Sequence, residues 1–186
     1  MNTIAEKAAL RRAARALRRA AFHSQAGAAL ANLFPPGLLA ASPAAGYWPM
    51  GSEIDPRPLL LRLRAHGADL LLPRIGVHGG LPEFLPWRPD APLTPDAYGV
   101  PAPAPAAGAP QQPRLLLVPL LAFDRSGGRL GQGGGHYDRV LAQLQPQGAL
   151  AVGLAYAAQE LPAVPREPHD QTLDWVVTER EAICCG

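Results

Sequence analysis

The stretch LLLVPLLAFDRSGGRLGQGGGHYDRVLAQL, from Leu115 to Leu144, decides the fold of this 186-residue chain. Its apolar beginning is too short to span a membrane and predicts a buried strand that ends near Phe123. Six of the nine residues from 127 to 135 are glycine. Val140, Leu141 and Leu144 then follow the spacing of the inner face of a helix. The order strand, glycine loop, helix predicts an α/β protein whose loop faces a ligand.

The glycine loop is expected to bind a phosphate. Glycine accepts positive φ and leaves the main chain bare, so several N–H groups can converge on one anion while the helix N-terminus adds its dipole. The loop is not a Walker A motif, because His136 and Tyr137 stand where lysine and Ser/Thr are required. Its spacing also departs from the Rossmann fingerprint, and no acidic residue follows about twenty positions later. A flexible glycine turn without a ligand is the structural alternative.

The string VPLLAFDRSGGRLGQGGGHYDRVL, residues 118–141, closely resembles the signature of the 5-formyltetrahydrofolate cyclo-ligase family, also called methenyltetrahydrofolate synthetases. That signature contains a proline, a Phe-Asp pair, RLG, a glycine-rich turn and YDR. The resemblance implies closure of 5-formyltetrahydrofolate to 5,10-methenyltetrahydrofolate, driven by ATP with Mg²⁺. In this loop it implies contacts to ATP from Arg129, Leu130, Gly131, Gln132, Gly133, Gly134, Gly135, His136 and Tyr137.

Two positions of the loop depart from the family pattern. Gln132 stands where many relatives have a large basic or aromatic residue, and His136 stands where tyrosine is usual. Glutamine keeps hydrogen-bonding capacity, and histidine keeps a ring that can stack. We interpret both as changes in affinity, and they leave open a non-catalytic module that binds nucleotide or folate.

Charge is concentrated at the N-terminus. Six cationic residues against Glu6 give the first twenty residues a net charge of +5, whereas the other 166 have a net charge of −3, within a total of +2. No apolar run reaches the roughly 18 residues of a spanning helix. The adjacent Cys184 and Cys185 cannot form a disulfide framework, which favours a reducing compartment. We expect one cytoplasmic, monomeric domain over residues 1–186, with small-molecule substrates and neither nucleic-acid nor membrane partners.

Residues 4–21 are predicted to form a basic helix. Lys7 and Arg11 lie one turn apart, so both can reach one polyanion. The pattern alone is typical of a solvated face, and a nucleic-acid arm would require interleaved aromatic residues that are absent. The family begins with a helix carrying K-x-x-x-R, so the resemblance implies that Lys7 and Arg11 contact ATP. The remaining arginines are expected to be solvated, namely Arg12, Arg15, Arg18 and Arg19.

The segments that follow predict a βαβ unit. A helix over residues 24–33 with Ser24 as its N-cap precedes a strand over residues 44–48. A second helix, capped by Asp55, is expected to run to residue 66, and a strand over residues 68–72 completes the unit. Glu53 lies in the turn after the first strand, where ligands of parallel sheets bind. Its structural alternative is an acid favoured by a helix N-terminus.

The resemblance implies that folate contacts Glu53 and Trp48, since a pterin presents N–H donors to a carboxylate and a flat face to an indole. A core position at the strand end is the structural alternative for Trp48. Tyr98, in Tyr98-Gly99-Val100-Pro101, resembles a weaker family element that walls the folate site. A turn in a loop is equally consistent with it.

The rest of the chain is expected to complete a single three-layer α/β/α domain with a mostly parallel sheet, Rossmann-like but without the fingerprint. An edge strand is predicted over residues 81–87, a mobile Pro/Ala-rich loop over 88–112, strands over 149–154 and 173–178, and a fraying tail over 179–186.

Two aspartates are candidates for metal binding. Mg²⁺ prefers one or two carboxylates together with phosphate oxygens and waters, which Asp138 and Asp170 can supply, and the resemblance implies this role for both. Their structural alternatives are an acid in a first helical turn and a turn residue. His136 and His169 lack the spacing of a zinc site. No side-chain nucleophile is expected, since phosphoryl transfer to a substrate requires mainly positioning and charge stabilisation.

Overall fold

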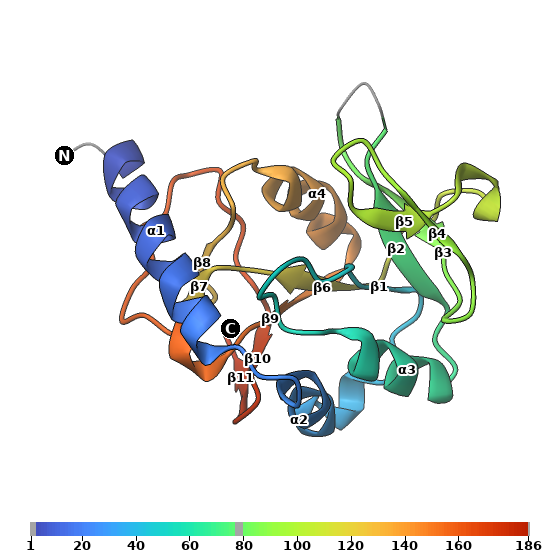
Figure 1. The fold of residues 1–186 in the computed structure, drawn as a ribbon, viewed down its shortest axis with the longest axis horizontal. Helices are drawn as coiled ribbons and strands as arrows, with labels where there is room; N and C mark the ends of the chain where they lie inside the picture. Colours follow the sequence, from blue (N-terminus) through green and yellow to red (C-terminus); the bar gives the residue numbers. More distant parts are fainter. Residues whose placement is uncertain (1–2, 77–79, 186) are drawn as a thin grey trace.

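A computed structural model describes residues 3–76 and 80–185. Its centre is a seven-stranded sheet with the order β11-β10-β9-β6-β1-β2-β3 (Figure 1). The five inner strands are mutually parallel, and the two outermost strands pair antiparallel. In chain order these strands are β1 (Ala44–Ala45), β2 (Leu70–Arg74), β3 (Glu83–Pro86), β6 (Leu115–Pro119), β9 (Leu150–Leu154), β10 (Trp175–Val177) and β11 (Ala182–Cys184).

Helices cover both faces of the sheet. Helices α2 (Ala26–Leu33) and α3 (Arg57–Ala65) lie on one face, and α4 (His136–Leu144) lies on the other (Figure 1). Residues along β6 alternate between the two cores, as expected for a strand with helices on both sides. Leu115 and Leu117 pack toward α2 and α3, whereas Leu116 and Val118 pack toward α4. This arrangement confirms the three-layer prediction.

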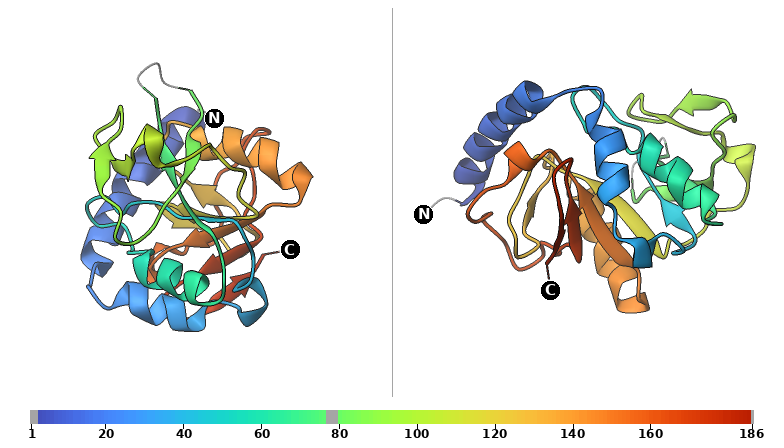
Figure 2. Two further views of the ribbon diagram at one scale, coloured as in Figure 1. Left: turned by 90° about the vertical axis from the view of Figure 1, so that its right-hand side faces the viewer. Right: turned by 90° about the horizontal axis from the view of Figure 1, so that it is seen from below.

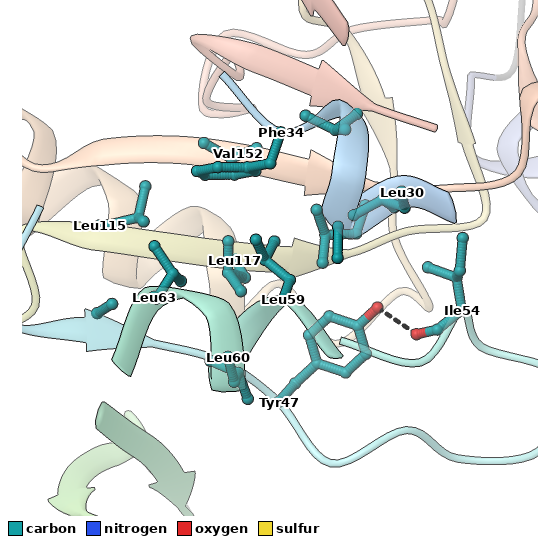
Figure 3. Close-up of a cluster of buried hydrophobic side chains, with 14 of the residues drawn as sticks. Leu30, Phe34, Tyr47, Ile54, Leu59, Leu60, Leu63, Leu115, Leu117 and Val152 are labelled. Atoms are coloured by element: carbon teal, nitrogen blue, oxygen red, sulfur yellow. Dashed lines mark hydrogen bonds between the residues drawn. The ribbon is translucent and has the colours of Figure 1, made fainter. Parts of the chain in front are cut away.

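The core beneath α2 and α3 is drawn in Figure 3, where leucines of α3 meet side chains of β6 and β9. Leu59, Leu60 and Leu63 are fully buried. Burial of one such leucine contributes about 2 kcal/mol relative to exposure. Tyr47 lies at the edge of this core, and its hydroxyl donates a 2.7 Å hydrogen bond to the Ile54 carbonyl. That bond ties the end of β1 to the turn that precedes α3.

Helix α1 (Thr3–Ala21) stands outside the three layers (Figures 1 and 2). It packs against a separate hairpin formed by β7 (Ala122–Phe123) and β8 (Arg129–Leu130). Ala14 of α1 joins Leu121, Ala122, Leu130 and Val164 in a small apolar cluster. The helix is therefore anchored to the segment that carries the glycine loop.

Several elements differ from the sequence-based expectations. The 88–112 loop contains a two-stranded ribbon, β4 (Leu93–Pro95) with β5 (Pro101–Pro103), followed by a short 3-10 turn at Pro105–Ala107. Proline is compatible with such an edge ribbon, because an edge strand need not donate every ladder hydrogen bond. The tail forms β11 because Ile183 is buried against Val176. Strand β1 is only two residues long, and Gln25, not Ser24, precedes α2 without a side-chain cap.

The order of the strands creates a crevice. From β1 the chain crosses through α3 to β2 on one side, and from β6 it crosses through α4 to β9 on the other side. The neighbours β1 and β6 therefore form the point at which the winding reverses. In open α/β sheets, ligands bind outside the carboxyl ends of the strands at such a point.

Candidate active site

A cleft of about 380 Å³ opens at the carboxyl ends of β1, β2 and β6. This volume is within the usual range for a small-molecule site. Its walls are α1, the turn after β1, the glycine loop with the start of α4, and the loop around residue 170. Of the sixteen site residues expected from the sequence, all but Tyr98 line this cleft.

The glycine loop presents bare main chain to the cleft. Gly133 and Gly135 have φ values of +110° and +63°, which L side chains rarely adopt. Gly135 is the residue that precedes α4, and it has the left-handed conformation. Within residues 3–76 and 80–185, the main-chain N–H groups of Gly133, Gly134 and Gly135 donate no hydrogen bond. Converging, unsatisfied donors at a helix N-terminus form an anion-binding site.

Helix α1 supplies two cations to the same end of the cleft. The Arg11 Nε donates a 3.1 Å hydrogen bond to the Gly131 carbonyl, and its guanidinium carbon lies 3.5 Å from the position that a Cβ on Gly133 would occupy. Lys7 is 5% exposed, and its Nζ lies 2.7 Å from Glu167 Oε2 and 2.6 Å from Asp170 Oδ2. Burial alone lowers the pKa of Lys7, but the hydrogen bonds to Asp170 and Glu167 outweigh it and raise the pKa. Lys7 is therefore held as a cation.

Arg129 is fixed between the glycine loop and the loop around residue 170. Its Nη2 lies 2.5 Å from Asp138 Oδ1, and its Nη1 donates to the Gln171 carbonyl. The Gln171 N–H in turn donates to Asp138 Oδ1. Burial lowers the pKa of Arg129, while Asp138 and Asp170 oppose that shift. The bond to Gln171 brings the two predicted metal ligands, Asp138 and Asp170, to the same wall of the cleft.

A group of side chains on that wall could hold a metal ion. Ligand atoms of Glu167, His169 and Asp170 lie within 4.8 Å of one another. The hydrogen bonds from Lys7 and the Glu167 N–H outweigh burial, which acts in the opposite direction, and lower the pKa of Asp170. A pair of carboxylates beside the glycine loop fits the preference of Mg²⁺ for hard oxygen ligands. Sequence reasoning missed Glu167, although an acid three residues before Asp170 was a usable signal.

The two unusual loop residues have partners. Gln132 Oε1 accepts hydrogen bonds from Arg15 Nε and Nη2 at 3.2 and 3.0 Å. The His136 ring lies edge-on to Tyr98 with a centroid separation of 5.9 Å, and its Nδ1 lies 3.2 Å from Arg139 Nη2. An arginine therefore lies beside each of these two residues.

The other end of the cleft carries Trp48 and Glu53. The Trp48 ring lines the cleft, packs edge-on against Trp87, and has the Arg57 guanidinium over it at 5.1 Å. Glu53 Oε2 accepts a 3.0 Å hydrogen bond from the Met50 N–H, and Oε1 lies 3.4 Å from Arg18 Nη1. A carboxylate and a flat ring therefore line the same part of the cleft.

One sequence-based expectation needs correction. Arg18 is not solvated: it is 8% exposed and pairs with Glu53, whereas Arg12 and Arg19 are exposed as expected.

Tyr98 is 62% exposed and is not among the residues that line the cleft, where Asp96 and Val100 lie instead. Asp96 accepts hydrogen bonds from the Tyr98 and Val100 N–H groups, which form a tight turn. The Tyr98 ring contacts the cleft through its neighbour His136.

Asp124 is a structural support that sequence reasoning did not identify. This residue is 4% exposed and accepts hydrogen bonds from the N–H groups of Ser126, Gly128 and Val164, and from Arg166 Nη2 at 3.0 Å. Burial alone raises its pKa, but the Ser126 hydroxyl and these amides outweigh burial and lower it. The carboxylate therefore joins the β7–β8 turn to the loop that leads to Glu167.

Fold and cleft define an α/β enzyme that combines an anion-binding glycine loop with a carboxylate and an aromatic ring at one topological switch point. Residues 3–179 match the model of the 5-formyltetrahydrofolate cyclo-ligase family, and the chain belongs to that family.

Relatives agree with this assignment. The chain is 36% identical over 144 residues to the 5-formyltetrahydrofolate cyclo-ligase of Mycolicibacterium smegmatis. This alignment covers 74% of this chain and 73% of the relative. It is 33% identical over 149 residues to the Escherichia coli K12 enzyme of the same name, in an alignment that covers 78% of this chain and 81% of the relative. The solved structure of Aquifex aeolicus 5,10-methenyltetrahydrofolate synthetase superposes on this chain with a TM-score of 0.76 at 28% sequence identity. The superposition covers 96% of this chain and 92% of the solved one.

Proposed function

We propose that this enzyme closes 5-formyltetrahydrofolate to 5,10-methenyltetrahydrofolate and converts ATP to ADP and phosphate. The observation that carries the proposal is the pairing of two subsites in one cleft. Unsatisfied amides of Gly133 to Gly135 face one end, with Arg11 beside them, and Trp48 and Glu53 face the other. The family and the relatives' names support the same reaction.

The chemistry explains why two subsites are needed. An N-formyl oxygen is a poor leaving group, so N10 of the folate cannot close the ring unaided. Transfer of the γ-phosphoryl group to that oxygen gives an iminium phosphate. N10 then attacks the activated carbon and loses its proton, and the C–O bond breaks to release phosphate. The role of the protein is to align the two substrates and stabilise the charge of the transferring group.

Each end of the cleft has a distinct task in this reaction. Main-chain N–H groups of the glycine loop bind phosphate oxygens, and Lys7 and Arg11 neutralise them. Glu53 accepts hydrogen bonds from the pterin N–H groups, and Trp48 contacts its flat face. Lys7 must leave Glu167 and Asp170, at least in part, to reach a phosphate.

Movement of Lys7 away from Glu167 and Asp170 would also free these two carboxylates for Mg²⁺. Asp138, Glu167 and Asp170 would hold the ion, which supplies charge neutralisation at the phosphates when bound. The residues fit, since ligand atoms of Glu167 and Asp170 lie within 4.8 Å of each other and Asp138 lines the same cleft. No membrane-crossing helix occurs in the part of the chain that the structure describes.

A direct assay tests the proposal. Purified protein is mixed with ATP, Mg²⁺ and 5-formyltetrahydrofolate, and the methenyl chromophore is followed in the near ultraviolet. We expect absorbance to rise only with all three components, with one phosphate released for each methenyl group formed. Binding of both substrates without any chromophore would contradict the proposal and favour the non-catalytic binding module.

A further inference from the structure

Arg18 is a buried cation that has no role in the reaction as proposed above. It lies on the same face of α1 as Lys7 and Arg11, because positions 7, 11 and 18 differ by only 20–40° around a helix of 3.6 residues per turn. Its Cα is about 16 Å from that of Lys7 along the axis at 1.5 Å per residue. One helix thus directs cations to both ends of the cleft.

The contacts of Arg18 converge on the folate end. Its Nη1 lies 3.4 Å from Glu53 Oε1, and its Nε donates a 3.2 Å hydrogen bond to the Ser52 hydroxyl. The other carboxylate oxygen, Oε2, accepts the Met50 N–H. The two oxygens of Glu53 are therefore held from different sides, one by α1 and one by its own turn.

This arrangement fixes the Glu53 carboxylate without saturating it. Each carboxylate oxygen can accept about two hydrogen bonds. Each Glu53 oxygen has one protein donor, so each can accept one more hydrogen bond. The two remaining acceptor positions match two adjacent N–H donors of a pterin ring. The Glu53 side chain is 13% exposed and the Arg18 side chain is 9% exposed. A carboxylate this buried is costly to keep ionised without a cation beside it.

We propose that Arg18 is a positioning residue that orients the Glu53 carboxylate for the folate ring, and thereby sets affinity at the folate end of the cleft. This inference rests on the proposed function, because it takes Glu53 as the folate contact. Arg18 itself is not among the residues that line the cleft. Its effect is expected on folate binding and not on nucleotide binding, although it shares a helix with Lys7 and Arg11.

The test compares Arg18→Met with Arg19→Met. Methionine keeps an apolar stem in place of the buried arginine, and Arg19 is the matched control because it is the next residue of α1 and is exposed. Dissociation constants for 5-formyltetrahydrofolate and for ATP are measured separately by calorimetry. We expect Arg18→Met to weaken folate binding about tenfold, the loss of one charge-assisted contact, and to change ATP binding less than twofold. Equal folate affinity in the two variants would overturn the inference.

Three further variants separate positioning from folding. Arg18→Lys restores the charge and is expected to recover part of the folate affinity, and Ser52→Ala should give a smaller loss than Arg18→Met. In a Glu53→Gln background, Arg18→Met should add little, because its effect passes through the Glu53 carboxylate. Independent, multiplying effects of Arg18→Met and Glu53→Gln would contradict the inference. Comparable losses of ATP and folate affinity with a lowered melting temperature would assign Arg18 a purely structural role.

The design distinguishes this inference from the proposed function. Absence of turnover by the wild-type enzyme contradicts the proposed reaction, while the binding constants still decide the role of Arg18. Turnover with no difference between Arg18→Met and Arg19→Met supports the reaction and overturns the inference.

Discussion

The two ends of the cleft are built on different principles. The end proposed to bind nucleotide consists of main chain, namely a run of glycines at a helix N-terminus whose amides donate no hydrogen bond within the described residues. The end proposed to bind folate consists of side chains, with Glu53 held by Arg18 and Trp48 held between Trp87 and Arg57. A main-chain site depends on local conformation, whereas a side-chain site depends on partners far away in the sequence. Substitutions at the two ends should therefore act differently.

The largest effect is expected from a change in main-chain conformation. Gly133→Ala places a Cβ on a residue with a φ of +110°, next to Arg11, so the loop must move and its donors lose their common target. We expect kcat/KM for ATP to fall about a hundredfold, as for loss of a preorganised donor. Gly148→Ala is the control, since Gly148 also has positive φ but lies outside the cleft. Similar losses in both variants would show that strain, and not ligand binding, is responsible.

The next effect concerns the cations of α1. Removing the Arg11 guanidinium deletes a charge-assisted contact, so Arg11→Ala should raise the KM for ATP about tenfold or more and leave the KM for folate nearly constant. Arg12→Ala is the matched control, because Arg12 is exposed on the same helix. Steady-state kinetics with each substrate varied in turn provide the measurement. If the two variants behave alike, Arg11 does not bind the phosphates.

The smallest effect on catalysis, at neutral pH, is expected at Asp124, which supports the β7–β8 turn beside the glycine loop. Asp124 has a pKa below its ordinary value in the folded state, so its contribution to stability is complete above the unfolded pKa of about 4 and is lost as the pH falls through the folded pKa. Asp124→Asn should lower the free energy of unfolding by about 2 kcal/mol at pH 7 and flatten its decline in acid.

Urea unfolding at several pH values measures this contribution, with the exposed Asp90→Asn as the control. A variant whose unfolding free energy keeps the wild-type slope below pH 4 would show that Asp124 does not carry the acid sensitivity. Turnover that falls without a loss of stability would instead place Asp124 in the chemistry.

The residues proposed to bind nucleotide could be selected from the sequence because each of the motifs that contain them is local. The glycines, the following helix and the Lys7/Arg11 spacing each lie within one short segment, and the structure places them together. The parallel sheet was equally accessible, since the βαβ order allows few topologies. The ribbon in residues 88–112 and strand β11 were missed, because short edge strands depend on tertiary pairing and have little periodicity of their own.

The folate end was only partly predictable for the opposite reason. The pair of Arg18 with Glu53 joins residues 35 positions apart. Nothing in the helical pattern of α1 distinguishes Arg18, which is buried, from Arg19, which is exposed. Only the docking of α1 across the turn after β1 makes that distinction.

In the proposed mechanism, amides of the glycine loop bind the terminal phosphates of ATP beside a folate held at Trp48 and Glu53. The most direct measurement is a crystal structure with a non-hydrolysable ATP analogue and 5-formyltetrahydrofolate. We expect phosphate oxygens within hydrogen-bonding distance of the Gly133 to Gly135 nitrogens, and the pterin ring against Trp48 with its N–H groups on the Glu53 carboxylate. Nucleotide bound elsewhere, with this loop making no contact to it, would contradict the account.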